Sequence, residues 1–342
     1  MIDDDNGVKR SWIFLLGGIV LAGWAVSRAL RRDFSFTGKS VLITGGSRGL
    51  GLVMARRICA EGGRVALIAR DANELALARD ELTKRGGEAI IVVCDLLERA
   101  QTDAAVEKVI NRFGAVDVLI NNAGVIEVGP LAHMQREDFE RAINLSFWAP
   151  FNLIRKIVPH MRRTGGGRIV NITSIGGKFG VPHLAPYCAG KFAMVGLSDS
   201  IRAELALDNI HVTTVVPGLM RTGSHVNAKF KGNHSAEYAW FSIAASLPVG
   251  TIGDESAAAK IIAACRAGQP TLIMPLPARV GIIGNALFPN LTGHVMKLVN
   301  RFLPRATGAS GNQLRSGKES RGAQPEWIAR FTDRMAQRNN ES

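Results

Sequence analysis

Short apolar runs separated by helix-length segments dominate the sequence from residue 36 onward. Most of these runs are rich in β-branched residues and lack polar alternation, which is typical of strands buried on both faces of a sheet. They cover residues 41–43, 65–68, 90–93, 116–120, 169–172 and 212–216, with a weaker seventh at 271–274. Repeated strand–helix units predict an α/β fold, a doubly wound parallel sheet of about seven strands with helices on both sides.

The amino-acid composition is that of a globular protein, and it limits the classes of partner that the protein is expected to bind. The 342 residues are 46% hydrophobic and 21% charged, which excludes a disordered or fibrous protein. The four cysteines are widely spaced, so we expect neither a disulfide scaffold nor a metal site. The net charge of +13 is spread along the chain without a nucleic-acid motif. We therefore expect no nucleic-acid partner and favour an anionic membrane surface.

A glycine-rich turn follows the first apolar run. In a Rossmann-type sheet of this kind, ligands bind at the carboxyl ends of the strands. Glycines let the backbone approach a pyrophosphate, and the helix that follows offers free N–H groups, although an ordinary strand-to-helix connection has the same composition. The candidate cofactor-binding residues here are Thr44, Gly45, Ser47, Arg48, Gly49, Leu50 and Gly51.

The residues after the second run bear on the choice of cofactor. An NAD-preferring site carries an acid here for the ribose 2′-hydroxyl, whereas an arginine suits the 2′-phosphate of NADP. Position 69 is alanine, Arg70 follows it, and Arg48 lies in the glycine-rich turn. Asp71 has capping-box spacing to Glu74, which gives it a structural role. The sequence therefore predicts NADP(H), unless both arginines are only solvated.

Polar or small residues also follow the third and fourth runs, at the same expected edge of the sheet. They are Asp95 after the third run, and Asn122, Ala123 and Gly124 after the fourth. Both positions suit cofactor contacts. Asp95 could equally cap a helix, and the Asn-Asn-Ala-Gly turn could equally be plain backbone structure.

Ser174 follows the fifth run, and Tyr187 and Lys191 lie further along the chain. Their i,i+4 spacing places Tyr187 and Lys191 on one face of a helix. A nearby ammonium should lower the phenol pKa from about 10, which makes Tyr187 a usable proton donor and acceptor. On its own, a Tyr-x-x-x-Lys pair is usually a surface pair, so the neighbouring motifs decide its meaning.

Together these residues resemble the short-chain dehydrogenase/reductase family, over about residues 38–274. The matching elements, in order, are the Thr-Gly-x-x-x-Gly-x-Gly turn at 44–51, Asp95, Asn-Asn-Ala-Gly at 121–124, Asn144, Ser174, Tyr187, Lys191, Pro217, Gly218 and Thr222. The resemblance implies an oxidoreductase that interconverts an alcohol and a carbonyl, and Arg48 and Arg70 make NADP(H) the expected cofactor. It also implies a homo-oligomer, since many members form dimers and tetramers. The alternative is a catalytically silent nucleotide-binding scaffold.

The resemblance also implies a role for each catalytic candidate. Tyr187 would exchange the proton with the substrate oxygen, and Ser174 would hold that oxygen by a hydrogen bond. Lys191 would bind the nicotinamide ribose and lower the tyrosine pKa. Asn144 would position a water in the proton relay, while Thr222, with Pro217 and Gly218 before it, would meet the nicotinamide carboxamide.

Residues 1–32 are expected to form a membrane anchor. The run from Ser11 to Ser27 is uncharged and would span about 25 Å as a helix, with Trp12 and Trp24 towards its ends. Three arginines between positions 28 and 32 favour a single-pass protein with its catalytic domain on the cytoplasmic side. A cleaved signal peptide and a buried terminal helix are the alternatives.

The remaining segments extend the predicted catalytic domain, residues 36–276. Aromatic and aliphatic residues between 221 and 250 indicate a lipophilic substrate, or else pack on the sheet. Residues 277–304 are expected to form an amphipathic helical extension that contacts the membrane, the domain or a second subunit, and 305–342 a mostly disordered polar tail. The apolar stripe of the extension is Leu291, Val295, Leu298, Val299 and Phe302.

Overall fold

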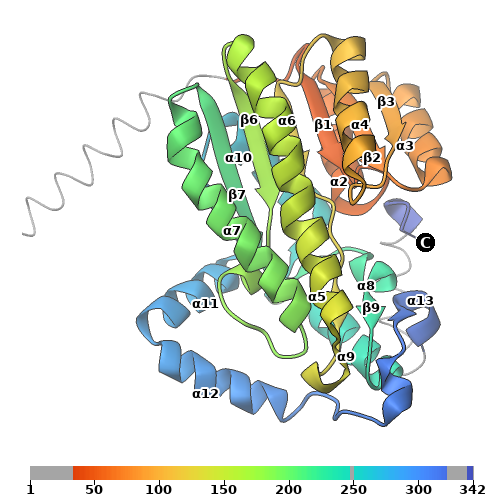
Figure 1. Ribbon diagram of the computed structural model, residues 1–342, viewed down its shortest axis with the longest axis vertical. Helices are drawn as coiled ribbons and strands as arrows, with labels where there is room; N and C mark the ends of the chain where they lie inside the picture. The colour runs from red at the N-terminus through yellow and green to blue at the C-terminus, as the bar shows by residue number, and fades with distance from the viewer. Residues whose placement is uncertain (1–33, 247–249, 322–336, 342) are drawn as a thin grey trace, which may run out of the picture.

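The computed structural model describes residues 34–246, 250–321 and 337–341. Its centre is a seven-stranded sheet in the order β11-β7-β6-β4-β1-β2-β3, with every neighbouring pair parallel (Figure 1). The strands are β1 (Ser40–Thr44), β2 (Arg64–Ala69), β3 (Glu88–Val93), β4 (Val118–Asn121), β6 (Gly167–Ile172), β7 (Ile210–Pro217) and β11 (Thr271–Met274). Each of the seven apolar runs thus contributes one strand, and the predicted doubly wound parallel sheet is confirmed.

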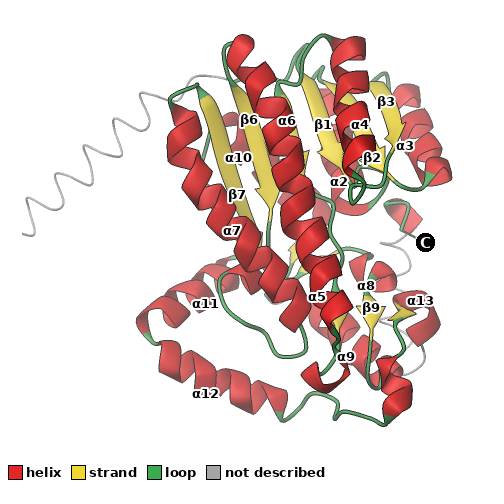
Figure 2. Ribbon diagram, viewed as in Figure 1, coloured by secondary structure: helices red, strands yellow, loops and turns green. Residues whose placement is uncertain are grey.

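Helices cover both faces of the sheet, as Figure 2 shows. Alternate side chains of a strand point to opposite faces, so Val41 and Ile43 enter one core cluster and Leu42 enters the other. One face packs against α2 (Gly49–Ala60), α3 (Ala72–Lys84) and α10 (Asp254–Arg266). The other packs against α4 (Arg99–Phe113), α6 (Ala149–Arg163) and α7 (Ala185–Ala206).

The strand order places a crevice where a cofactor is expected. From β1 the chain moves outward through β2 and β3, then returns to β4 on the other side of β1 and continues through β6 and β7. The direction of winding therefore reverses between β1 and β4. In open α/β sheets, ligands bind outside the carboxyl ends of the strands at this point.

A smaller layer covers the carboxyl edge of the sheet. It contains the three-stranded sheet β12-β9-β5, with α8 (Ser224–Asn227), α9 (His234–Ser246) and α13 (Gly317–Ser320) around it. Its strands are β5 (Glu127–Val128), β9 (Lys229–Phe230) and β12 (Arg315–Ser316). Phe230, Tyr238 and Phe241 are buried together within this layer. These aromatic residues of the 221–250 segment therefore pack as a core.

One expectation for the C-terminal part needs correction, and one of three alternatives for the helical extension is excluded. Residues 309–320, expected to be disordered, form a 3₁₀ turn, β12 and α13, because β12 pairs with β9 and extends the small sheet. Residues 277–304 do form helices, α11 (Leu276–Leu287) and α12 (Pro289–Asn300). However, the apolar stripe on α12 is exposed to solvent, so it does not pack against the catalytic domain.

The predicted membrane anchor, residues 1–32, lies outside the described residues. Among the helices of the described ranges, none is both long and apolar enough to cross a membrane.

Candidate active site

Ser174, Tyr187 and Lys191 come together at the carboxyl end of β6. Ser174 is the second residue after β6, with Thr173 between it and the strand. Its hydroxyl forms a hydrogen bond with Tyr187. Lys191 lies one turn after Tyr187 on α7, with its Nζ 5.7 Å from the centre of the tyrosine ring. The same ammonium donates a 2.9 Å hydrogen bond to the carbonyl of Ile172. The cluster has the arrangement that the i,i+4 spacing predicts.

The electrostatics of this cluster differ from the prediction. Burial raises the pKa of Tyr187 to about 12, although the hydrogen bond from Ser174 acts to lower it. Burial also lowers the pKa of Lys191 to about 8. Removing each group from water disfavours its charged form. The ammonium of Lys191 is also hydrogen-bonded to the carbonyl of Ile172 rather than to the phenol. The predicted lowering of the tyrosine pKa by Lys191 is therefore wrong for this structure.

Asn144 stands at the end of α5 (Arg136–Ile143), where the helix passes into a π-helical turn over Asn144–Trp148. Such turns occur often at functional sites because they change the direction of a helix face. Gly190 on α7 makes the close approach to this turn possible, since a Cβ there would lie 2.7 Å from the carbonyl oxygen of Ala142. Sequence reasoning did not single out Gly190; its place between Tyr187 and Lys191 was the available signal.

The glycine-rich turn and the Asn-Asn-Ala-Gly turn hold each other. The Oγ1 of Thr44 accepts hydrogen bonds from the backbone N–H groups of Asn122 (2.9 Å) and Ala123 (3.0 Å). The side-chain amide of Asn122 donates to the carbonyls of Thr44 and Gly45, each at 3.1 Å. Asn122 therefore joins the loops after β1 and β4. This is a structural role of the kind that the sequence analysis gave as the alternative to cofactor binding. Gly124 lies beside the ammonium of Lys191.

Helix α2 begins at Gly49 and directs its N-terminal end towards the crevice. Gly51 allows the turn to fold tightly, because a Cβ there would lie 2.2 Å from the carbonyl oxygen of Gly45. Leu50 is buried beside it. The turn thus leaves backbone N–H groups, rather than side chains, at the place where a pyrophosphate is expected.

Arg48 and Arg70, the two arginines on which the NADP prediction rests, have different surroundings. Arg48 pairs with Glu74, its Nη1 lying 2.6 Å from Oε1, and Ser47 donates a 2.9 Å hydrogen bond to the other carboxylate oxygen. Arg70 is exposed after β2, and within the described residues it has no ion pair. Asp71 caps α3 by accepting from the backbone N–H of Glu74 at 2.9 Å, as predicted. The Glu74 carboxylate, however, turns to the glycine-rich turn.

Asp95 does not cap a helix. Its carboxylate accepts a 3.0 Å hydrogen bond from the backbone N–H of Leu97 and so closes a short turn, while α4 begins later, at Arg99. The helix-cap alternative for Asp95 is therefore wrong. The residue still lies just beyond β3, at the carboxyl edge of the sheet where it was expected.

Pro217 ends β7, and Gly218 and Thr222 follow it at the same edge of the sheet. The backbone N–H of Gly218 donates to the carbonyl of Met274 at 2.7 Å and fixes the start of the loop. Thr222 is buried, and its Oγ1 accepts from the backbone N–H of Ser224 at 3.3 Å. This loop brings the backbone of Gly223 to the crevice.

The C-terminal residues Asn339, Asn340 and Glu341 lie over the glycine-rich turn, a contact that the prediction of a disordered tail missed. The N–H of Gly49 donates to the carbonyl of Asn339 at 2.8 Å. The N–H of Gly223 donates to the carboxylate of Glu341 at 2.6 Å. A carboxylate thus accepts from the loop after β7, and it lies beside Gly49 at the start of α2.

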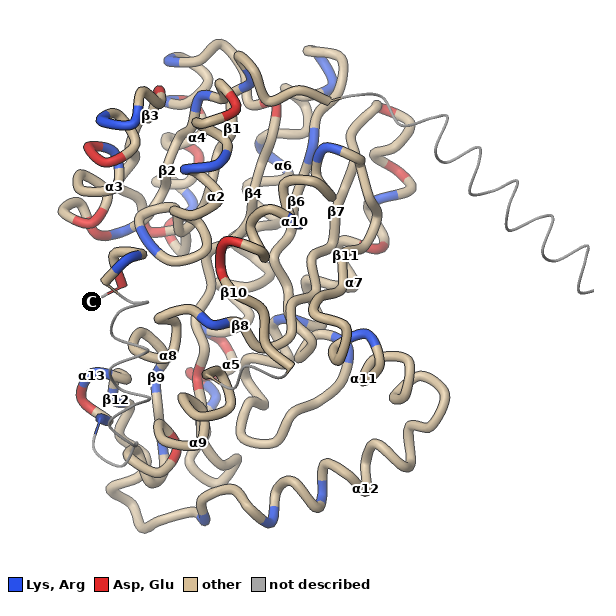
Figure 3. The backbone as a smooth tube through the Cα atoms, turned by 180° about the vertical axis from the view of Figure 1, so that it is seen from behind, with Lys and Arg blue, Asp and Glu red and all other residues tan. Residues whose placement is uncertain are grey.

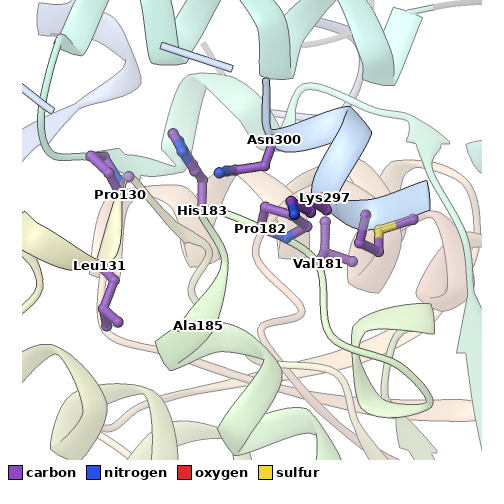
Figure 4. A pocket seen from close by; sticks show the side chains of 10 residues that line it. Pro130, Leu131, Val181, Pro182, His183, Ala185, Lys297 and Asn300 are labelled. Carbon is purple, nitrogen blue, oxygen red and sulfur yellow. The ribbon is translucent and has the colours of Figure 1, made fainter. Parts of the chain in front are cut away.

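A cavity of about 460 Å³ lies between α12 and the loop that leads to Tyr187 (Figure 4). Lys297 and Asn300 project into it from α12, facing Pro182 and His183. His183 pairs with the fully buried Glu237 of α9 at 2.9 Å, which fixes the imidazole at the cavity wall. The other lining residues are Gly129, Pro130, Leu131, Val181, Ala185 and Met296.

Comparisons with known proteins agree with this geometry. A family model described as short chain dehydrogenase matches residues 39–231. The chain is 36% identical over 228 residues to a putative ketoacyl reductase of Streptomyces coelicolor, covering 65% of this chain and 87% of that one. It is 31% identical over 279 residues to a fatty acyl-CoA reductase of Acinetobacter baylyi, covering 81% and 89%.

A solved structure shows the same fold. A metagenomic short-chain oxidoreductase in complex with NADP superimposes with a TM-score of 0.58 and 30% identity, covering 70% of this chain and 98% of that one. The matched sequence, the seven-stranded sheet and the Ser174–Tyr187–Lys191 cluster all lead to one assignment. The chain belongs to the short-chain dehydrogenase family of oxidoreductases.

Proposed function

We propose that this protein is an NADP(H)-dependent oxidoreductase that interconverts an alcohol and a carbonyl on a lipophilic substrate. The observation that carries the proposal is the cluster of Ser174, Tyr187 and Lys191 at the carboxyl end of β6. A silent nucleotide-binding scaffold would have no need to keep a hydroxyl, a phenol and an ammonium together in a buried site, where each costs desolvation free energy.

The chain's own residues would move and hold the proton. When bound, the nicotinamide ring supplies or accepts the hydride. Tyr187 would donate its proton to the carbonyl oxygen in reduction and take it back in oxidation. Ser174, already hydrogen-bonded to Tyr187, would hold the same oxygen. Lys191, fixed on the carbonyl of Ile172, keeps two further N–H donors for the ribose hydroxyls and the phenol.

The crevice fits a dinucleotide. The backbone N–H groups of Gly49, at the N-terminus of α2, and of Gly223 already donate hydrogen bonds to oxygens of the chain's own tail. One of these oxygens belongs to a carboxyl group, which like a phosphate needs several donors. Arg70 directly follows Ala69, and Arg48 lies in the glycine-rich turn. Because position 69 is not an acid, it does not repel a 2′-phosphate, which supports NADP over NAD. Asp95, Asn122 and Thr222 complete the proposed cofactor edge.

Two observations support a lipophilic substrate. Within that class, a ketoacyl or long-chain carbonyl compound is the narrower choice. The relatives above are named for acyl substrates. The cavity beside α7 is lined mainly by apolar side chains, including Pro130, Leu131, Val181 and Met296. The aromatic residues of the 221–250 segment do not support it, because Phe230, Tyr238 and Phe241 are buried in the small sheet layer.

Membrane attachment through residues 11–27, with the catalytic domain on the cytoplasmic side, completes the proposal. The uncharged run with tryptophans near both ends, and the arginines after it, support it. Deleting residues 1–32 should release a soluble, active domain. Recovery of the full chain in the soluble fraction without detergent would contradict the anchor.

The activity is tested by a screen of lipophilic ketones, aldehydes and alcohols, including 3-oxoacyl thioesters, followed by nicotinamide absorbance. We expect NADPH-dependent reduction of at least one long-chain carbonyl compound. Saturable binding of NADPH without turnover of any compound, in either direction, would instead favour the silent scaffold.

A further inference from the structure

Helix α12 presents an apolar face that no described residue covers. Leu291, Val295, Leu298 and Phe302 recur at i, i+4, i+7 and i+11, so they share one face, and they are 60%, 45%, 53% and 82% exposed. Among the described residues of this helix, none is buried. The opposite face carries Met296, Lys297 and Asn300, which line the cavity. The apolar face therefore points away from the body of the protein.

Helix α11 carries further exposed apolar side chains, and the charged residues of both helices have one sign. Its large exposed apolar side chains, together with that of the connection to α12, are Leu276, Val280, Ile283, Leu287 and Phe288. No Asp or Glu occurs between positions 256 and 318, whereas Arg279, Lys297, Arg301 and Arg305 lie in or beside the two helices. Figure 3 shows blue without red along α11 and α12.

We propose that α11 and α12 dock flat on an anionic lipid bilayer. An exposed apolar face bordered only by Lys and Arg is the pattern of helices that lie in the membrane interface. A second copy of the chain fits less well, because a twofold contact through this face would bring the same cations together. Docking would also bring the cavity to within about one helix diameter of the lipid surface, with α12 between them. Its use as a substrate entrance rests on the proposed function, while the docking itself does not.

A local probe separates this contact from any attachment by residues 11–27. In the full-length protein carrying Cys59→Ser, an NBD fluorophore would be attached at Val295→Cys or, as a control, at Leu207→Cys. Leu207 is 92% exposed and follows the last turn of α7, about 33 Å along that helix from its start at the cavity. Vesicles of phosphatidylcholine, alone or with about 30% phosphatidylglycerol, provide the two surfaces.

We expect a blue shift and quenching by spin-labelled lipid at position 295, stronger with the anionic vesicles, and no change at position 207. Arg301→Gln with Arg305→Gln should weaken the anionic-vesicle response by roughly tenfold or more. Arg85→Gln with Arg99→Gln, which removes equal charge from α3 and α4, should leave it unchanged. A blue shift at position 295 without vesicles would mean that a second copy or another segment covers the face, and would overturn the proposal.

The C-terminal tail, residues 337–341, gives rise to a second and independent inference. The C-terminal residues are bound in the crevice through buried contacts, with Asn339 fully buried and Glu341 6% exposed. The guanidinium of Arg56 donates to Oδ1 of Asn339 at 3.0 Å and to the carbonyl of Arg338 at 2.9 Å. The amide of Asn339 donates in turn to the carboxylate of Asp254. These partners come from α2 and α10, so the tail joins two helices of the main domain.

The tail uses the groups that a pyrophosphate would use. Two backbone donors are occupied in this way, since the N–H of Gly49 bonds to Asn339 and the N–H of Gly223 bonds to Glu341. Asn340 holds the tail to the same turn by donating to the carbonyl of Ser47 at 3.1 Å. We infer that residues 339–341 and the dinucleotide compete for one site, so that the protein holds its own crevice closed until cofactor displaces the tail. This inference rests on the proposed function, because it requires a nicotinamide dinucleotide to bind here.

Point variants in the full-length chain test the competition. Asn339→Ala with Glu341→Ala should tighten the Kd for NADPH by about tenfold, measured by titration of protein fluorescence. Gln337→Ala is the matched control, since its side chain is exposed on the same segment, and it should leave the Kd unchanged. A peptide of residues 337–342 should compete with NADPH for the double variant.

The outcomes separate this inference from the proposed function. An unchanged or weaker Kd for NADPH in the double variant would overturn the competition while leaving the cofactor assignment intact. Failure of every form of the protein to bind either NADPH or NADH would contradict the proposed function itself.

Discussion

Arg48 and Glu74 form an ion pair across the edge of the crevice, with Nη1 of the arginine 2.6 Å from Oε1 of the glutamate. Ser47 donates to the same carboxylate, so Glu74 is held against the glycine-rich turn by two partners. Glu74, five residues beyond Ala69, therefore brings an acid to the glycine-rich turn. In the proposed NADP(H) complex, Arg48 would share its guanidinium between this carboxylate and the 2′-phosphate, whereas Arg70 is exposed and has no such competitor among the described residues.

Replacing Arg70 should reduce selectivity for NADPH. Arg70→Ala is expected to weaken NADPH binding by at least about tenfold and leave NADH nearly unchanged, because one charge-assisted hydrogen bond to the 2′-phosphate is lost. Dissociation constants for both nucleotides in wild type and variant decide the matter. Equal affinity of the wild-type protein for NADH and NADPH would show that these arginines only face solvent.

Neutralising Glu74 should have the opposite effect. Glu74→Gln removes the charge that competes for Arg48, so we expect NADPH binding to tighten by a few-fold, with a smaller change for NADH. The effect is modest because both side chains are partly exposed, at 38% and 24%, and solvent screens the pair. If Glu74→Gln weakened NADPH binding instead, the ion pair would be organising the site rather than competing with it.

Helix packing behind the active site can be tested with two glycines of α7. Gly190→Ala should destabilise the fold by about 1–3 kcal/mol and reduce turnover, because its Cβ would press on the carbonyl of Ala142. Gly196→Ala is the matched control, since a Cβ there meets nothing within 4 Å. It should be neutral or stabilising by up to about 1 kcal/mol. Urea unfolding of both variants measures the difference, and equal stabilities would contradict the close approach.

Docking of the tail should depend on pH through Glu341. Burial raises the pKa of its carboxyl to about 7; the N–H of Gly223 and Arg48 act to lower it, and Asp254 and Glu74 raise it further. A free glutamate has its pKa near 4.5. The docked state thus favours the protonated form, and docking is strongest below the free pKa and weakens as pH rises through about 7.

The expected result is a stronger effect of the tail in acid. The gain in NADPH affinity on disrupting the tail with Asn339→Ala should be larger at about pH 6 than at about pH 8.5. Glu341→Gln cannot titrate, so in that background the gain should be the same at both values. A gain that grows with pH in the wild-type background would contradict this account of Glu341.

The sheet and the catalytic cluster could be predicted because their signals are local. Buried strands need continuous apolar runs, so β1 and β2 are visible in the sequence, and i,i+4 spacing alone brings Tyr187 and Lys191 to one face of α7. The direction of the tyrosine pKa could not be predicted. It depends on how fully the fold removes the phenol and the ammonium from water, and on the carbonyl of Ile172 that engages the lysine.

Contacts between residues distant in sequence account for the other differences. Glu74 had the spacing of a capping box, but its carboxylate meets Arg48 and Ser47 from another loop. Asn339 and Glu341 lie in a polar stretch of the kind that usually stays disordered, and they are ordered by backbone N–H groups of two separate loops. No periodicity or motif within the tail reveals such partners.

Proton transfer by Tyr187 to and from the substrate oxygen is the step on which the proposed activity depends. Its most direct test is the turnover of Tyr187→Phe with NADPH and a carbonyl substrate, together with the Kd of the variant for NADPH. We predict that turnover falls by at least about a hundredfold while the Kd changes little, because only the phenol hydroxyl is removed. Near-normal turnover by the variant would contradict the mechanism.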